Sequence, residues 1–127
     1  MNETNQDVTN QTVMNTAEIF KALGDGSRLR ILKLIAAKGN ILCVGYIAKH
    51  LGLSQPAVSQ HLKQLKNVGI LAGERQGYHV HYSINPKILA PYGIDTLAFL
   101  KSFGAELDLN GNCEFHQDED TCARLNQ

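Results

Sequence analysis

Residues 44–71, VGYIAKHLGLSQPAVSQHLKQLKNVGIL, constrain the fold more than any other part of the chain. They predict a short helix, a three-residue turn and a longer helix that begins after Ser54. Along the second helix, Val58, Leu62 and Leu65 have the i, i+4, i+7 spacing of a buried face. The other face presents amide, hydroxyl and ammonium groups without a carboxylate, which suits the acceptor-rich major groove of DNA. The segment therefore predicts a helix-turn-helix unit.

The length and the cysteines limit the class of protein. With 127 residues the chain makes one domain with a modest core. No apolar run approaches the roughly 20 residues that a membrane span needs, and the polar first residues resemble neither a signal nor a transit peptide. Three cysteines in a chain without an export signal favour reduced thiols over a disulfide framework. We expect a cytoplasmic protein without a membrane partner.

The net charge of zero conceals an uneven distribution. Residues 21–87 contain ten lysines and arginines against two carboxylates, which gives +8. The remainder contains two basic residues against ten carboxylates, which gives −8. Such asymmetry is typical of a nucleic-acid-binding core with acidic flanks, and it also occurs where charged faces are merely solvated.

The local composition divides the chain into three parts. Residues 1–14 are rich in Asn, Thr and Gln and are expected to form a disordered tail. Residues 15–107 are expected to form the DNA-binding and dimerisation domain, and residues 108–127 an acidic tail that contains Cys and His. Within the domain, one helix is predicted from about residue 15 to Gly24, and another from Asp25 or Ser27 to residues 39–40.

A hairpin is predicted directly after the helix-turn-helix. Residues 70–75 and 78–84 form the expected strands, and Arg75, Gln76 and Gly77 form the tip. A hairpin in this position is a wing, which makes the predicted fold mainly α with a small β-hairpin (α+β), a winged helix-turn-helix. After the wing, helix is expected from Pro86, with an interruption near Pro91 and a last helix over about residues 94–107.

Three stretches resemble the ArsR/SmtB family of winged-helix repressors: FKALGDGSRLRILKLI, IAKHLGLSQPAVSQHLKQLKNVGIL and the hairpin ending HVHYSIN. The resemblance spans roughly residues 15–86. It implies a homodimer that forms through the first and last helices and binds a pseudo-palindromic operator. The apolar stripes of those helices are compatible with a dimer interface and equally with an intrachain core. They consist of Ile19, Phe20 and Leu23 in the first helix, and Leu97, Leu100 and Phe103 in the last.

The predicted DNA contacts lie on the second helix of the motif and on the wing. Gln suits adenine, Ser suits a base or a phosphate, and Lys suits guanine or a phosphate. The predicted set is Ser54, Gln55, Ser59, Gln60, Lys63, Arg75 and Gln76, with Lys66 as a further phosphate contact. His61 is expected to be packed or partly buried. His79 and His81 share one side of a wing strand, where they contact phosphate, bind metal or, as the favoured interpretation, are solvated.

The signal to which the protein responds is predicted from its cysteines. Cys43 falls where the family often carries a Cys-Val-Cys metal box, but Gly45 replaces the second cysteine. The family's alternative site in the last helix is absent, because residues 94–107 contain no histidine. Cys43, Cys113 and Cys122 would suit As(III), and His116 would complete a Cys3His set for Zn(II). Redox or reactive-sulfur sensing by Cys43 with a tail cysteine is the alternative, and a merely structural Cys43 is a third.

The predicted function is that of a repressor that a soft metal or metalloid ion releases from its operator. DNA binding itself is expected to need no cofactor. An enzyme is not expected, because the chain lacks a glycine-rich phosphate loop and a nucleophile–base set. A winged-helix module for protein interaction is the competing class. Such a module is expected to have an acidic or apolar recognition helix, whereas the recognition helix predicted here is neither acidic nor apolar.

Overall fold

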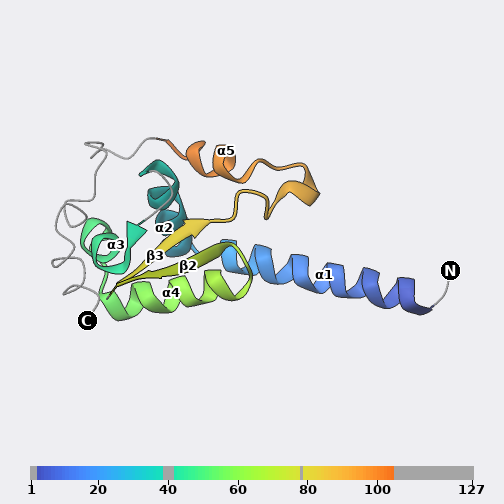
Figure 1. The fold of residues 1–127 in the computed structure, drawn as a ribbon. Coiled ribbons are helices and arrows are strands. Elements are labelled where there is room, and N and C mark those ends of the chain that lie inside the picture. Colours follow the sequence, from blue (N-terminus) through green and yellow to red (C-terminus); the bar gives the residue numbers. More distant parts are fainter. Residues whose placement is uncertain (1–2, 39–41, 78, 105–127) are drawn as a thin grey trace.

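Helices surround a small antiparallel sheet in the computed structural model, which describes residues 3–38, 42–77 and 79–104 (Figure 1). The elements in chain order are α1 (Glu3–Leu23), α2 (Gly26–Ala37), β1 (Leu42–Cys43), α3 (Val44–Leu51), α4 (Gln55–Asn67), β2 (Leu71–Gln76), β3 (His79–Ile84), the 3-10 helix η1 (Ala90–Tyr92) and α5 (Thr96–Lys101). The predicted winged helix-turn-helix fold is confirmed. None of the described helices is both long enough and apolar enough to cross a membrane.

The helix-turn-helix forms as the sequence predicted. Gly52 ends α3 in the left-handed conformation, with φ of 70°. Ser54 caps α4, because its Oγ accepts a hydrogen bond from the backbone N–H of Ala57 at 3.2 Å. The stripe of Val58, Leu62 and Leu65 is fully buried. This apolar face of α4 fixes which side of the helix is left to solvent.

The sheet contains one strand more than the predicted hairpin. Its strand order is β1-β3-β2, and both pairings are antiparallel. The hairpin pairs Leu71 with Ile84 at its base and Gln76 with His79 at its tip. The additional strand β1 pairs Leu42 with Tyr82 and Cys43 with His81. The wing is therefore joined through β1 to the start of α3.

The core lies between α2, the motif and the sheet. Four apolar residues of α2 are fully buried: Ile31, Leu32, Leu34 and Ile35. Helix α5 packs against α2, and α4 packs against β2. As a result α5 lies on one side of the body and α4 on the opposite side (Figure 1).

The first helix begins much earlier than predicted. It starts at Glu3, so most of the segment expected to be disordered, residues 1–14, is helical in the structure. The segment contains neither glycine nor proline to stop a helix. Side chains also stabilise successive turns, because Gln11 Nε2 donates to Asn15 Oδ1 at 2.9 Å and Thr16 Oγ1 donates to the Thr12 carbonyl at 2.7 Å. The N-terminal part of α1 extends away from the rest of the molecule (Figure 1).

The region after the wing is less helical than predicted. Asn85 Oδ1 accepts from the Lys87 backbone N–H at 3.0 Å, as a cap would, but only turns and the short η1 follow. Gly93, with φ of 75°, ends η1. Helix α5 has six residues rather than the expected span of about 94–107, and the positive φ of Gly104, 102°, lies just beyond it. Residues 105–107 and the predicted acidic tail, 108–127, lie outside the described part of the chain.

Candidate nucleic-acid interface

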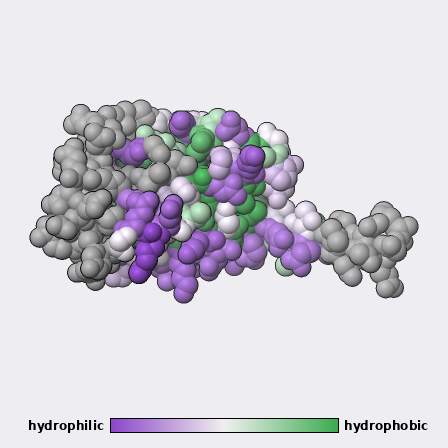
Figure 2. All heavy atoms as spheres, in the orientation of Figure 1, coloured by the Kyte–Doolittle hydropathy of each residue, from purple (hydrophilic) through white to green (hydrophobic). Residues whose placement is uncertain are grey.

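The solvent-facing side of α4 carries the predicted base-reading residues. Ser54, Ser59, Gln60 and Lys63 are exposed, and Gln55 is half-buried in the first turn. The surface along α4 is hydrophilic in Figure 2. No residue of α4 is a carboxylate. The exposed face therefore offers hydrogen-bond donors and positive charge to a partner rich in acceptors, as the major groove of DNA is.

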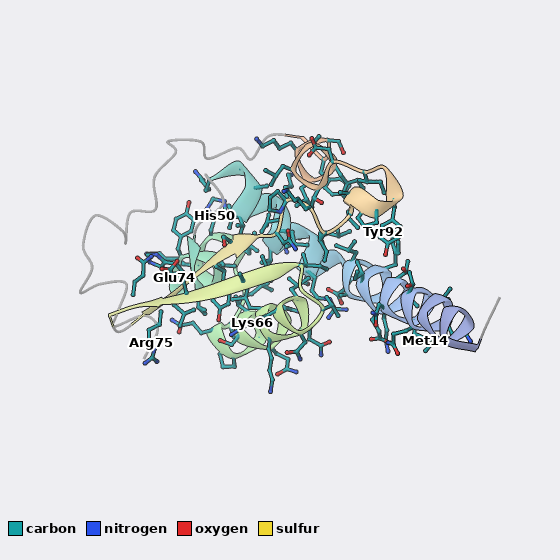
Figure 3. The ribbon with its side chains drawn as sticks, turned by 45° about the vertical axis from the view of Figure 1, so that its right-hand side comes forward. Met14, His50, Lys66, Glu74, Arg75 and Tyr92 are labelled. Carbon is teal, nitrogen blue, oxygen red and sulfur yellow. The ribbon has the colours of Figure 1, made fainter. Side chains whose placement is uncertain are left out.

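The wing places one exposed arginine beside this face. Arg75 and Gln76 are exposed at the end of β2, and Gly77 turns the chain with φ of 67°. Arg75 on the wing and Lys66 on α4 lie toward the same side of the molecule in Figure 3. The structure thus brings one predicted residue of the wing tip and one of α4 onto the same side. Direct contact of these residues with DNA stays a prediction.

Two arginines of α2 donate hydrogen bonds to the C-terminal ends of neighbouring helices. Arg30 Nη2 donates to the carbonyl oxygen of Leu51, the last residue of α3, at 3.3 Å. Arg28 Nε donates to the Ala22 carbonyl near the end of α1 at 2.7 Å. Both bonds satisfy carbonyls that a helix end leaves without an intrahelical partner. Neither bond could be predicted from a local pattern, because the partners lie six and 21 positions away in the chain.

A carboxylate and a histidine lie near the back of α4. Asp25 caps α2, and the pKa of its carboxyl is lowered from the ordinary 3.8 mainly by the hydrogen bond from the Arg28 backbone N–H. Burial opposes this shift, and the charges of Arg28 and His61 lower the pKa further. His61 is half-buried, as predicted, and its Nδ1 is buried without a hydrogen-bond partner within the described residues. His61 is thus a packed residue, and that it does not read bases stays a prediction.

Cys43 is fully buried where the sheet meets the helix-turn-helix. It is the N-cap residue of α3, with φ of −95° and ψ of 160°, and its side chain makes no capping hydrogen bond. The other predicted sensing residues, Cys113, His116 and Cys122, lie outside the described residues. In the part of the chain that the structure describes, no three His, Cys, Asp or Glu side chains form a group able to hold a metal ion.

His81 is placed differently from the favoured prediction. Rather than being solvated, it is half-buried and its Nε2 is buried. The cause is β1, the strand that the sequence analysis did not predict, because β1 lies beside His81 and places Cys43 opposite it. The side chain of His79 lies outside the described part of the structure.

The fold, the carboxylate-free face of α4 and the exposed Arg75 of the wing define a winged helix-turn-helix protein of the DNA-binding type. Residues 25–72 match the family model described as "Bacterial regulatory protein, arsR family". The transcriptional repressor SdpR of Bacillus subtilis is 38% identical over 71 residues, which cover 56% of this chain and 77% of that protein. The chain belongs to the arsR family of bacterial regulators.

Two further relatives extend the comparison. The arsenic resistance transcriptional regulator ArsR1 of Pseudomonas putida is 42% identical over 79 residues, which cover 62% of this chain. The chain spans only 59% of the length of that regulator. The homodimeric winged helix-turn-helix DNA-binding domain Mb0332 of Mycobacterium bovis superposes with a TM-score of 0.61 at 28% identity, over 74% of this chain and 82% of that domain.

Proposed function

We propose that this protein is a homodimeric transcriptional repressor that binds a pseudo-palindromic operator and is released by a thiol-binding signal at Cys43. The DNA-binding part of this proposal rests on the exposed face of α4, which is polar and partly basic and contains no carboxylate. A protein-interaction module would be expected to present an acidic or apolar face there. Kinship with the repressor SdpR supports the regulatory part of the proposal.

Each polar group of the interface has a role in this proposal. Gln55 and Gln60 read adenine through their amide groups, and Ser54 and Ser59 bind base edges or phosphates. The cations bind guanine or the sugar–phosphate backbone: Lys63, Lys66 and Arg75. Gln76 at the wing tip adds a neutral contact beside Arg75. The amides and hydroxyls therefore carry sequence preference, and the phosphate contacts supply affinity that depends on salt.

The exposed apolar side chains of α1 support a homodimer. Val13 and Met14 are each 59% exposed, and Phe20 is 46% exposed. Tyr92 of η1 lies beside this helix: its ring centroid is 5.8 Å from that of Phe20, and its hydroxyl is hydrogen-bonded to Thr16 Oγ1 at 2.6 Å (Figure 3). An apolar surface of this kind is normally covered, and a second copy related by twofold symmetry covers both surfaces at once. Such symmetry matches a pseudo-palindromic operator.

The signal acts at Cys43 in this proposal. The thiol is fully buried between the wing sheet and the first helix of the motif. Because a closely packed interior has no room for an added atom, an ion or substituent on Sγ displaces α3 or the wing. Both elements belong to the DNA-binding unit, so occupancy changes DNA affinity. The ion is As(III) with the thiolates of Cys113 and Cys122, or Zn(II) when His116 joins them.

A redox signal is the second candidate. This chemistry needs only two sulfurs, whereas coordination of As(III) or Zn(II) needs three or four ligands. Cys43 and one tail cysteine would then form a disulfide or polysulfide bridge, with the same effect on α3 and the wing.

DNA binding is tested by fluorescence anisotropy with a labelled duplex at increasing salt concentration. Affinity is expected to fall steeply with salt, and Lys63→Ala and Lys66→Ala are each expected to lower the slope of log K against log [salt] by about 0.9. Lys101→Ala is the matched control, because Lys101 is an exposed lysine of α5, on the side of the body opposite α4. Affinity that does not change with salt would refute the DNA-binding proposal.

The signal is tested by titration of As(III), Zn(II) and polysulfide into the protein–DNA complex. Wild type is compared with Cys43→Ser, Cys113→Ser and Cys122→Ser. Release by an ion under strong reductant supports coordination, and release only by polysulfide or an oxidant supports redox chemistry. A wild-type response in all three variants refutes sensing by cysteine.

A further inference from the structure

Three chemically active residues occupy one row across the wing sheet. Cys43 of β1 lies opposite His81 of β3, and Glu74 of β2 lies opposite His81 on the other side. Directly opposed residues of antiparallel strands share a face of the sheet, and their Cβ atoms are about 5 Å apart. The strand order β1-β3-β2 therefore places a thiol, an imidazole and a carboxylate side by side, with the imidazole in the middle.

The row runs from the interior to the solvent. Cys43 is fully buried, His81 is half-buried with its Nε2 buried, and Glu74 is exposed on the wing (Figure 3). With a Cβ separation of about 5 Å, sulfur and nitrogen can both reach one ion held about 2.0–2.3 Å from each of them. The buried Cys43 and the half-buried His81 thus have the spacing of a two-ligand site.

Glu74 occupies the position of a supporting residue for such a site. A histidine that binds a metal usually donates the N–H of its other ring nitrogen to a carboxylate or a carbonyl, which fixes the ring and strengthens the ligand. Glu74 is the carboxylate next to His81 on the side away from Cys43. The order of the three residues is therefore ligand, ligand and orienting carboxylate.

The donor set selects the class of ion. Thiolates favour Cu(I) and Zn(II), and imidazole suits copper and zinc as well. Zinc sites in proteins usually have three or four protein ligands, whereas the described residues provide no group of three. A soft ion that is stable with two ligands therefore fits the pair of Cys43 and His81.

We propose that Cys43 and His81 bind a soft ion of low coordination number, Cu(I) in type, and that Glu74 orients His81. This inference rests on the proposed sensing role of Cys43 and takes the second ligand from the wing instead of the tail. The Cys43 thiol releases its proton to water as the ion binds. The bound ion joins the start of α3 to β3, so it alters the position of the wing relative to the helix-turn-helix.

The test uses the full chain with Cys113→Ser and Cys122→Ser, which leaves Cys43 as the single thiol. Cu(I) affinity is measured anaerobically, without DNA, by competition with a chromophoric Cu(I) chelator. We expect one Cu(I) per chain and no tight site after Cys43→Ser. His81→Gln is expected to lower the affinity by tenfold or more, and Glu74→Gln by about tenfold. His79→Gln is the matched control, because His79 pairs with Gln76 and not with β1.

Unchanged Cu(I) affinity in His81→Gln overturns the proposal, and so does Zn(II) binding as tight as Cu(I) binding in the parent. Circular dichroism checks that His81→Gln is folded. If it is not, the exposed Glu74→Gln decides, and unchanged affinity there overturns the proposal. The proposed function and the proposed site fail separately. If Cu(I) binds through His81 but does not release the protein from DNA, the sensing role is refuted and the Cys43–His81 site stands. If Cu(I) releases the protein from DNA whether or not His81 is present, the site is refuted and the sensing role stands.

Discussion

Arg30 Nη2 donates a hydrogen bond to the carbonyl oxygen of Leu51, 3.3 Å away. The bond joins α2 to the last residue of α3, immediately before the turn of the motif. Because the turn sets the angle between α3 and α4, loss of this bond is expected to disturb DNA binding more than stability. Arg30 therefore acts as a positioning residue for the recognition helix.

Arg30→Gln tests this role. The free energy of unfolding is expected to fall by only about 0.5–1 kcal/mol, since the bond is long and its side chain exposed. Operator affinity is expected to fall severalfold, measured by anisotropy beside a urea titration. Arg30→Lys keeps the charge and separates its effect from that of the guanidinium geometry. Full affinity in Arg30→Gln would contradict the positioning role.

Substitutions at Ser54 separate helix capping from DNA contact. Ser54→Ala removes the acceptor for the Ala57 N–H and is expected to cost about 1 kcal/mol in the free energy of unfolding. Ser54→Asp keeps a capping acceptor, so stability is expected to stay near wild type. Its negative charge at an exposed position beside DNA is expected to weaken operator binding strongly. Urea denaturation and anisotropy measure the two effects, and an unchanged DNA affinity in Ser54→Asp contradicts the predicted contact.

Asp25 predicts a specific dependence of stability on pH. Its folded pKa lies below 3.8, chiefly because the Arg28 backbone N–H donates to the carboxylate. A lowered folded pKa means that the carboxylate stabilises the fold above the ordinary value. This contribution is lost as the pH falls through the lowered folded pKa. Asp25→Asn keeps an acceptor for the cap and removes the titration. Urea midpoints between about pH 3 and pH 7 should therefore decline less in Asp25→Asn than in wild type, and parallel declines would contradict the assignment.

The exposed face of α1 predicts the oligomeric state. Met14→Asp places a charge on a side chain that is 59% exposed in one chain. If a second copy covers this face, the dimer loses about 1.5–3 kcal/mol for each buried side chain, which weakens association at least tenfold. Sedimentation equilibrium measures the change, and Glu18→Gln, an exposed polar position of the same helix, is the control. A wild-type dimer of Met14→Asp would exclude this face as the interface.

Strong local signals made the motif and the wing predictable. The cap at Ser54, the stop at Gly52 and the buried stripe of α4 each depend on residues within a few positions of one another. The alternating pattern of β3 is equally local. The length of α1 was not predictable in this way, because its polar N-terminal half resembles a disordered segment although nothing in it stops a helix.

By itself, the sequence determined the helix-turn-helix, the hairpin after it and the polar, carboxylate-free face of α4, because caps, turns and periodicity are properties of neighbouring residues. Only the tertiary structure decided what lies beside Cys43. The short strand β1 has no signal of its own, and its pairing with β3 joins residues nearly forty positions apart. That pairing places His81 between Cys43 and Glu74, since a sheet aligns side chains by register and not by their order in the chain.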